Sequence, residues 1–305
     1  MDDARTRRPW TPARGLALLL ACLAVLLAPA GARAFADDAE PDPPADGRGL
    51  DAPEGDEGED DDLDAEAPKD PRDEVVELRA LDDKEAKALA EGLSKASRRK
   101  DPEDVNPALD AIEGVTHASF VKPLLKLMAH DNSRVAQRAA DLLAQRATID
   151  DVKDLWKKGW DEKANRRRYA VRTSILKAFA RLELDLDKRQ YEDVEREWRW
   201  MLGNPQEAYG PALADICWYM GVRGDKRHAL AMAKELDAPE SNDPHNPATP
   251  PVEWWERRWK QWKGMHAQAV AALKRLTGQT FKTREEAKTW FTANEASFGV
   301  PWKDW

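Results

Sequence analysis

The sequence of 305 residues contains only two cysteines, Cys22 and Cys217. Cys22 lies in an N-terminal segment that is expected to be removed, which leaves Cys217 alone, so neither an intrachain disulfide nor a zinc cluster is predicted. Cys217 lies between Ile216 and Trp218, where a free cysteine packs as a small hydrophobic side chain. A catalytic thiol needs a basic neighbour, and the next histidine, His228, has no evident third partner.

Catalytic motifs are also missing from the sequence. The chain has no G-x-S-x-G, H-E-x-x-H, Walker or G-x-G-x-x-G motif, and its five histidines lack the spacing of metal ligands. Carboxylates are abundant, but they lie in amphipathic stretches, where solvent-facing acidic residues are expected. The sequence therefore predicts a protein that is not an enzyme and that needs no cofactor.

Long apolar runs are missing as well. The uncharged run over residues 16–28 is shorter than the roughly 20 residues that span a bilayer. It follows four arginines and ends before the small-residue site Ala32-Arg33-Ala34, the pattern of a secretory signal peptide. We expect residues 1–34 to be removed and the mature chain to be periplasmic or secreted. The alternatives are an uncleaved N-terminal anchor and lipidation at Cys22.

The acidic charge of the chain is concentrated in one segment. Residues 37–70 contain sixteen acidic and two basic residues, whereas the whole chain carries a net charge of −9. A segment so charged and so poor in large apolar residues cannot form a core, so residues 35–80 are predicted to be a disordered acidic linker. It lacks the ligand order of a calcium-binding loop. The remaining chain is nearly neutral, which argues against a nucleic-acid partner.

Two stretches share one helical pattern of apolar residues, displaced by 36 positions from Val135 to Val171. A shorter apolar stretch precedes each of them, at residues 121–128 and 152–156. Helix pairs that recur at such a distance stack on their neighbours, because one pair alone cannot bury its apolar faces. The apolar positions are Val135, Ala139, Leu142 and Leu143 in the first stretch, and Val171, Ile175, Phe179 and Leu182 in the second.

These stretches resemble the second helix of a HEAT-type (armadillo-like) repeat. The resemblance rests on Asp131, Val135, Ala139, Ala140 and Leu143, and on the Val-Arg pair at residues 171–172. A degenerate third unit at 211–239 resembles a tetratricopeptide unit about as well. The resemblance implies an all-α fold, an α-α superhelix over residues 81–240. Solenoids of this kind bind partners on an extended concave surface.

A proline-rich loop at 241–251 separates the repeats from a tryptophan-rich C-terminal cap at 252–305. In the cap, Trp255, Trp259 and Trp262 begin one helical stripe that continues to Leu273 and should pack against the repeats. Trp254 and Arg258 lie at the edge of this stripe and are expected to remain accessible. The L-T-G-Q-x-F stretch at 276–281, followed by a short helix with tryptophan, resembles the C-terminal cap of exported bacterial HEAT-repeat proteins.

An arginine cluster is the other candidate for binding. Positive charge at a helix start opposes the helix dipole, so the cluster should have an anionic counterpart. We expect this to be the acidic residues 150, 151 and 154, the acidic linker, or an anionic partner. The candidate partner-binding residues are Arg166, Arg167, Arg168, Arg172, Trp254 and Arg258.

The sequence thus predicts an exported scaffold that binds a protein or peptide. Two alternatives remain open at this point. One is a cell-envelope glycan-binding protein that uses the tryptophan-rich helix, since indole rings stack on sugars. The other is a structural spacer without a dedicated ligand.

Overall fold

A computed structural model describes residues 70–74, 76–240 and 250–303. The predicted signal peptide, the linker up to residue 69 and most of the 241–251 loop lie outside these residues. The predicted all-α class is confirmed, because the described residues form helices and a single pair of two-residue strands, β1 (Arg79–Ala80) and β2 (Val115–Thr116), which run parallel. No helix among the described residues has the length and apolar character that a membrane crossing requires.

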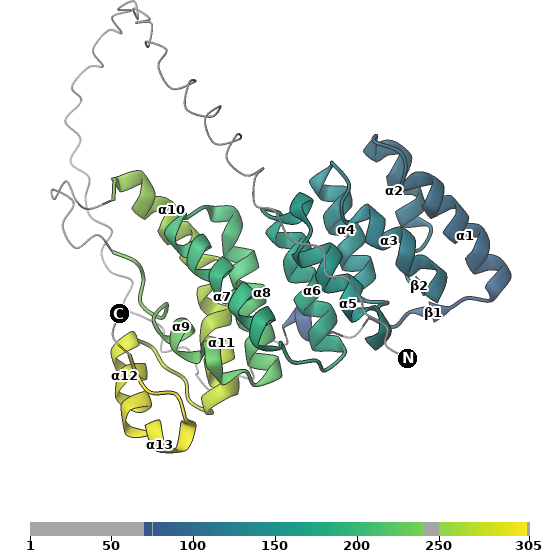
Figure 1. Ribbon diagram of the computed structural model, residues 1–305. Coiled ribbons are helices and arrows are strands. Elements are labelled where there is room, and N and C mark those ends of the chain that lie inside the picture. Colours follow the sequence, from purple (N-terminus) through teal and green to yellow (C-terminus); the bar gives the residue numbers. More distant parts are fainter. Residues whose placement is uncertain (1–69, 75, 241–249, 304–305) are drawn as a thin grey trace, which may run out of the picture. The chain divides into compact units, whose positions relative to one another are not determined.

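The first ten α-helices follow one another in chain order (Figure 1). They are α1 (Asp83–Ala96), α2 (Pro102–Asp110), α3 (Val121–Leu127), α4 (Ser133–Ala144), α5 (Val152–Leu155), α6 (Tyr169–Arg181), α7 (Lys188–Gly203), α8 (Gly210–Arg223), α9 (Ala229–Ala233) and α10 (Val252–Lys263). The last three are α11 (His266–Thr277), α12 (Arg284–Ala293) and α13 (Glu295–Phe298).

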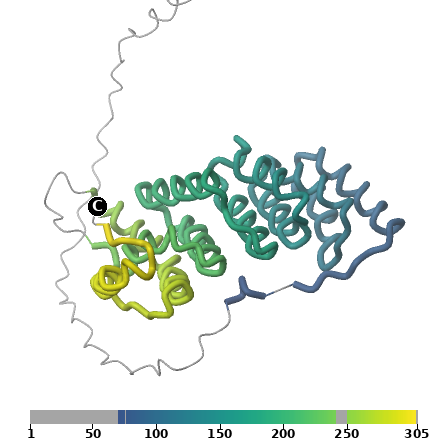
Figure 2. The backbone as a smooth tube through the Cα atoms, turned by 60° about the horizontal axis from the view of Figure 1, so that its bottom comes forward, coloured from purple at the N-terminus to yellow at the C-terminus, as the bar shows by residue number. Residues whose placement is uncertain are grey.

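Five of the helices pack side by side in chain order. Helix α2 contacts α4, α4 contacts α6, α6 contacts α8, and α8 contacts α11. We call α2, α4, α6, α8 and α11 the second-helix layer. The helices α1, α3 and α5 precede α2, α4 and α6 in the chain, and Figure 2 shows the path of the backbone through them.

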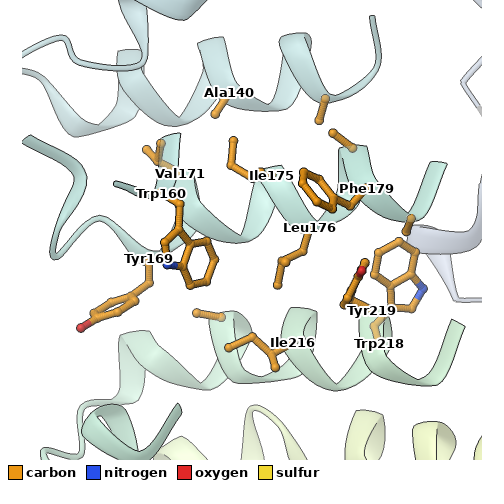
Figure 3. Close-up of a cluster of buried hydrophobic side chains, with 14 of the residues drawn as sticks. Ala140, Trp160, Tyr169, Val171, Ile175, Leu176, Phe179, Ile216, Trp218 and Tyr219 are labelled. Atoms are coloured by element: carbon orange, nitrogen blue, oxygen red, sulfur yellow. The ribbon is translucent and has the colours of Figure 1, made fainter. Parts of the chain in front are cut away.

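The repeated apolar positions form the contacts between these helices. Val135 and Val171 are buried at equivalent places in α4 and α6. Figure 3 shows Ile175 and Phe179 on the side of α6 that faces Ala140, and Leu176 on the side that faces Ile216 of α8. Full burial of such a side chain stabilises a fold by roughly 1.5–3 kcal/mol. The predicted helices 36 residues apart and their buried stripes are therefore confirmed.

Helix starts follow the capping rules. Asp101 and Pro102 begin α2, because the Asp101 carboxylate accepts the Glu103 amide at 2.9 Å and Pro102 takes the first helical position. Thr283 caps α12, and the Thr283 hydroxyl accepts the Glu286 amide at 3.2 Å. The Glu286 carboxylate accepts the amide of Lys282, one residue before the cap.

Helix α7 was not predicted from the sequence. Its start is fixed by a reciprocal cap between Asp187 and Gln190, and its inner face carries the buried residues Val194, Trp198 and Met201. Their spacing of four and three residues is helical, so an amphipathic signal was present. The charged residues between these buried positions obscured the amphipathic pattern, because they make α7 the most polar of the long helices that pair with the second-helix layer.

The C-terminal stripe was predicted as one helix and is two. The chain turns at Gly264-Met265 between α10 and α11, because the start of α8 packs against that turn backbone to backbone. A Cβ atom on Gly210 would lie 3.0 Å from the Cα atom of Gly264, so neither position has room for a side chain. The buried face of α10 is consequently made by Arg258 and Gln261, and not by the tryptophans.

The predicted linker ends earlier than residue 80. Residues 71–73 form a 3-10 turn, and Arg79 and Ala80 pair with Val115 and Thr116. At the other end of the chain, Trp302 packs against the core beside Phe291, with ring centroids 6.1 Å apart. Trp305 lies outside the described residues.

Candidate functional site

A row of polar side chains crosses the second-helix layer. Arg138 of α4 pairs with Asp110 and Glu113 at the end of α2, the latter at 2.8 Å. Ser174 of α6 donates its hydroxyl to Asp141 of α4 at 2.6 Å. We call this row the polar ladder. Its members are Asp110, Glu113, Arg138, Asp141, Ser174, Lys177 and Asp215.

Lys177 links two carboxylates in the ladder. Its ammonium lies 3.9 Å from Asp141 of α4 and 3.4 Å from Asp215 of α8. Burial raises the pKa of Asp141 and the nearby Asp215 charge raises it further, while the Ser174 hydrogen bond and Lys177 act against the rise. The ladder is therefore a coupled set of charges that joins three neighbouring helices.

A segment distant in sequence lies at the α8 end of the ladder. We call residues 70–74 the N-terminal arm; it is the first coloured piece of the tube in Figure 2. The Arg72 guanidinium donates to Asp215 of α8 at 2.7 Å. Asp73 accepts from the indole of Trp218 at 2.8 Å and from Arg275 of α11. Asp70 accepts from the amide of Gln268 of α11.

Opposing effects act on the arginine of the arm. Burial lowers the pKa of Arg72, but the hydrogen bond and charge of Asp215, aided by Asp70, outweigh burial, so the pKa is raised. The guanidinium is thus held charged between two carboxylates that come from different segments of the chain.

The arm is held by polar contacts alone, since none of its residues is fully buried. Ordering a residue costs about 1–2 kcal/mol of backbone entropy. A hydrogen bond contributes about 0.5–1.5 kcal/mol net, and about 1.5–3 kcal/mol when one group is charged. Four contacts therefore roughly balance the ordering of five residues. The arm is bound with a small margin.

The predicted arginine cluster divides into exposed and buried members. Arg166 and Arg167 are exposed, whereas Arg168 donates to the backbone carbonyls of His130 and Asp131. Arg172 is buried, so its accessibility to a partner was wrongly predicted.

The counterpart of Arg172 also differs from the prediction. Its guanidinium pairs with Glu197 of α7 at 2.9 Å and donates to the Trp160 carbonyl at 3.0 Å. The expected acidic residues 150, 151 and 154 make no ion pair with the cluster among the described residues. The reason is that α7, which was not predicted, carries Glu197, the carboxylate that pairs with Arg172.

The tryptophan-rich helix also differs from expectation. Arg258 is buried and paired with Glu235, so the prediction that it stays accessible was wrong. Trp254 is half-buried and packs edge-on against Trp255, with centroids 4.8 Å apart. The most exposed indole of α10 is Trp259 at 41%, and the Lys263 ammonium lies 3.7 Å from its ring centroid.

Two arginines that the sequence analysis did not single out join successive second helices. Arg146, just beyond α4, donates to the carbonyls of Ile112 and Val115 beyond α2, the latter at 2.9 Å. Arg181, at the end of α6, donates to Ala144 at 2.8 Å in the same way. Burial lowers the pKa of Arg146 to about 10, so it stays charged at neutral pH. Each arginine thus joins its own helix end to backbone carbonyls at or just beyond the end of the preceding second helix.

His228 is the one histidine with no exposed surface among the described residues. Its centroid lies 4.6 Å from the ring of Trp198, which it meets at 87°. Burial lowers the pKa of His228 to about 4, against the weaker influence of Asp225. Cys217 is also fully buried, as predicted, and burial raises the pKa of its thiol. Neither residue has the exposed surroundings that a catalytic group needs.

No metal-binding cluster of three or more His, Cys, Asp or Glu residues exists in the part of the chain that the structure describes. The chain matches no family model, and no curated protein and no solved structure is detectably similar to it.

Proposed function

We propose that the protein is an exported, non-catalytic α-α repeat scaffold of the HEAT-like kind that binds an extended protein or peptide segment on its second-helix layer. One observation carries the proposal. The polar ladder runs over four successive helices of that layer, from Asp110 at the end of α2 to Asp215 in α8. Solenoids bind partners along such a repeated surface.

The repeat character is supported by three features that recur along the chain. The apolar stripes of α4 and α6 are equivalent over 36 residues. Arg146 and Arg181 make the same kind of contact with the preceding second helix. Each of α2, α4, α6 and α8 follows a helix of its own, namely α1, α3, α5 and α7. Export is supported by the sequence of residues 1–34.

The glycan alternative has less support. A sugar-binding platform needs an open aromatic face. The exposed ring of α10 belongs to Trp259, whose face is occupied by Lys263, while Trp254 and Trp255 are half-buried against each other. The alternative of a structural spacer without a ligand gives no reason for a polar ladder along the second-helix layer.

The test compares two double variants in a cross-linking pull-down from native cell-envelope extract. Arg138→Ala with Lys177→Ala removes two cations of the ladder, and Lys122→Ala with Lys153→Ala removes two exposed cations from α3 and α5. We expect a specific protein to be recovered with the wild type and the second variant, and lost with the first. Equal recovery with both variants, or recovery of no protein, contradicts the proposal.

A further inference from the structure

The N-terminal arm lies on the second-helix layer, and its sequence indicates which kind of partner the layer binds. We propose that α8 and α11 form a binding site for a short acidic peptide with aspartates on both sides of an arginine, and that the N-terminal arm occupies this site as a built-in competitor. The inference deepens the proposed function and rests on it.

Three charged groups of the arm, those of Asp70, Arg72 and Asp73, each meet a complementary group of the site. The Asp73 carboxylate lies between the Trp218 indole and the Arg275 guanidinium. On the other side of Arg72, Asp70 meets the Gln268 amide. Arg72 itself meets Asp215, where the polar ladder ends. The site is therefore complementary to a peptide with negative, positive and negative charges in that order. A peptide without the two aspartates would leave Trp218, Gln268 and Arg275 without these acceptors.

The arm carries its own conformation to the site. Asp70 accepts the Arg72 amide on its side chain at 2.9 Å, and its carbonyl accepts the Asp73 amide at 2.8 Å. Pro71 fixes the backbone within this turn. No backbone hydrogen bond joins the arm to α8 or α11 among the described residues. Recognition therefore depends on side chains that a separate peptide of the same sequence can present equally well.

Competition follows from how the arm is attached. The arm belongs to the same chain as α8 and α11, so its effective concentration at the site is high although its own contacts are few and partly exposed. A partner displaces it by making further contacts along the ladder, towards Lys177 and Arg138. The arm thus sets a threshold that only a peptide longer than itself overcomes.

The test uses the full chain and a fluorescein-labelled synthetic peptide with the sequence of residues 66–77. An arm variant carries Asp70→Ala and Asp73→Ala. A second variant adds Gln268→Ala and Arg275→Ala to these changes. By fluorescence anisotropy at low salt, we expect the arm variant to bind the peptide at least tenfold more tightly than the wild type. We expect the second variant to lose this binding. Thermal unfolding followed by circular dichroism shows that each variant is folded.

A peptide with asparagine at both aspartate positions is the matched control, and we expect at least tenfold weaker binding to the arm variant. Three results overturn the inference: equal affinity of wild type and arm variant, unchanged binding after Gln268→Ala and Arg275→Ala, and no binding to any folded variant. The pull-down distinguishes the two proposals. If the ladder variant loses the partner in the pull-down but the peptide does not bind, only this inference is contradicted. If the peptide binds but the pull-down recovers no partner, only the proposed function is contradicted.

Discussion

The contact between α4 and α6 and the contact between α8 and α11 join second helices in different ways. Between α4 and α6, large side chains such as Ile175 and Phe179 fill the space, and Arg181 closes the ends. Between α8 and α11, small residues let the backbones approach, since a Cβ atom on Gly221 would lie 2.8 Å from the Cα atom of Ala272. The contact between α4 and α6 depends on large side chains, whereas the contact between α8 and α11 depends on small ones.

Phe179→Ala should have the largest effect on stability. The ring is buried, packs against Trp156 at 5.7 Å and fills the space between α4 and α6. Removing it leaves a cavity, so we expect the free energy of unfolding to fall by about 3–5 kcal/mol. Urea denaturation followed by circular dichroism measures this. Trp259→Ala is the control, since that indole is 41% exposed and its loss should change stability little. A fall of less than 1 kcal/mol for Phe179→Ala would show that volume does not hold this contact.

Gly221→Ala tests the opposite contact. The added methyl group meets the backbone of Ala272, which cannot move aside as a side chain can. We expect a fall in the free energy of unfolding of about 3 kcal/mol relative to Gly92→Ala, at the upper end for overpacking. Gly92 also lies inside a helix, α1, but has nothing within 4 Å of the added atom, so the gain in helix propensity is common to both variants. Equal stability of the two variants refutes the close approach.

The difference between the two contacts also explains what the sequence could predict. Side-chain packing leaves a periodic apolar stripe, so α4, α6 and their 36-residue shift were predicted correctly from Val135 and Val171. Backbone packing leaves only glycine and alanine. The turn at Gly264 and the burial of Gln261 were therefore missed, although Gly210 and Gly264 were visible in the sequence.

The candidate site was predicted less well, because its charges are paired across long distances in sequence. Arg172 and Arg258 looked like accessible cations, but each is buried and paired with a distant glutamate, Glu197 of α7 or Glu235 in the turn after α9. The N-terminal arm was assigned to the disordered linker on composition alone. Its Asp73 is held by Trp218 and Arg275, which lie far away in the sequence, and no local sequence pattern predicts such distant contacts.

The dependence of stability on acid pH should differ between two buried basic groups, Arg146 and His228. Arg146 is buried with carbonyl acceptors and stays charged, whereas His228 is buried neutral among aromatic rings. The pKa of His228 is about 4 in the folded chain, against about 6.5 when unfolded. The unfolded chain therefore binds more protons between these values, and stability falls as the pH drops from about 6.5 towards 4.

We expect His228 to account for a loss of about 2 kcal/mol in the free energy of unfolding between pH 7 and pH 5. His228→Phe removes the titrating group while keeping an aromatic ring, so its loss over the same interval should be smaller by that amount. Urea denaturation at the two pH values measures both proteins. His117→Phe, which changes a half-buried histidine near α1, is the control. Parallel pH profiles for wild type and His228→Phe contradict the assignment.

The smallest effect on stability is expected for Arg166→Ala combined with Arg167→Ala. Both side chains are exposed, and exposed charges contribute at most about 0.5 kcal/mol when changed. Arg172→Ala is the matched comparison within the same cluster, and it should lower the free energy of unfolding by about 1–3 kcal/mol, because it leaves Glu197 and the Trp160 carbonyl without their donor. Urea denaturation of the three proteins compares them directly. If the double variant also fails to capture the partner in the pull-down, the exposed pair belongs to the binding surface, and the surface extends from the ladder to the start of α6. If it captures the partner as the wild type does, Arg166 and Arg167 are solvated residues and binding is confined to the ladder and to the site on α8 and α11.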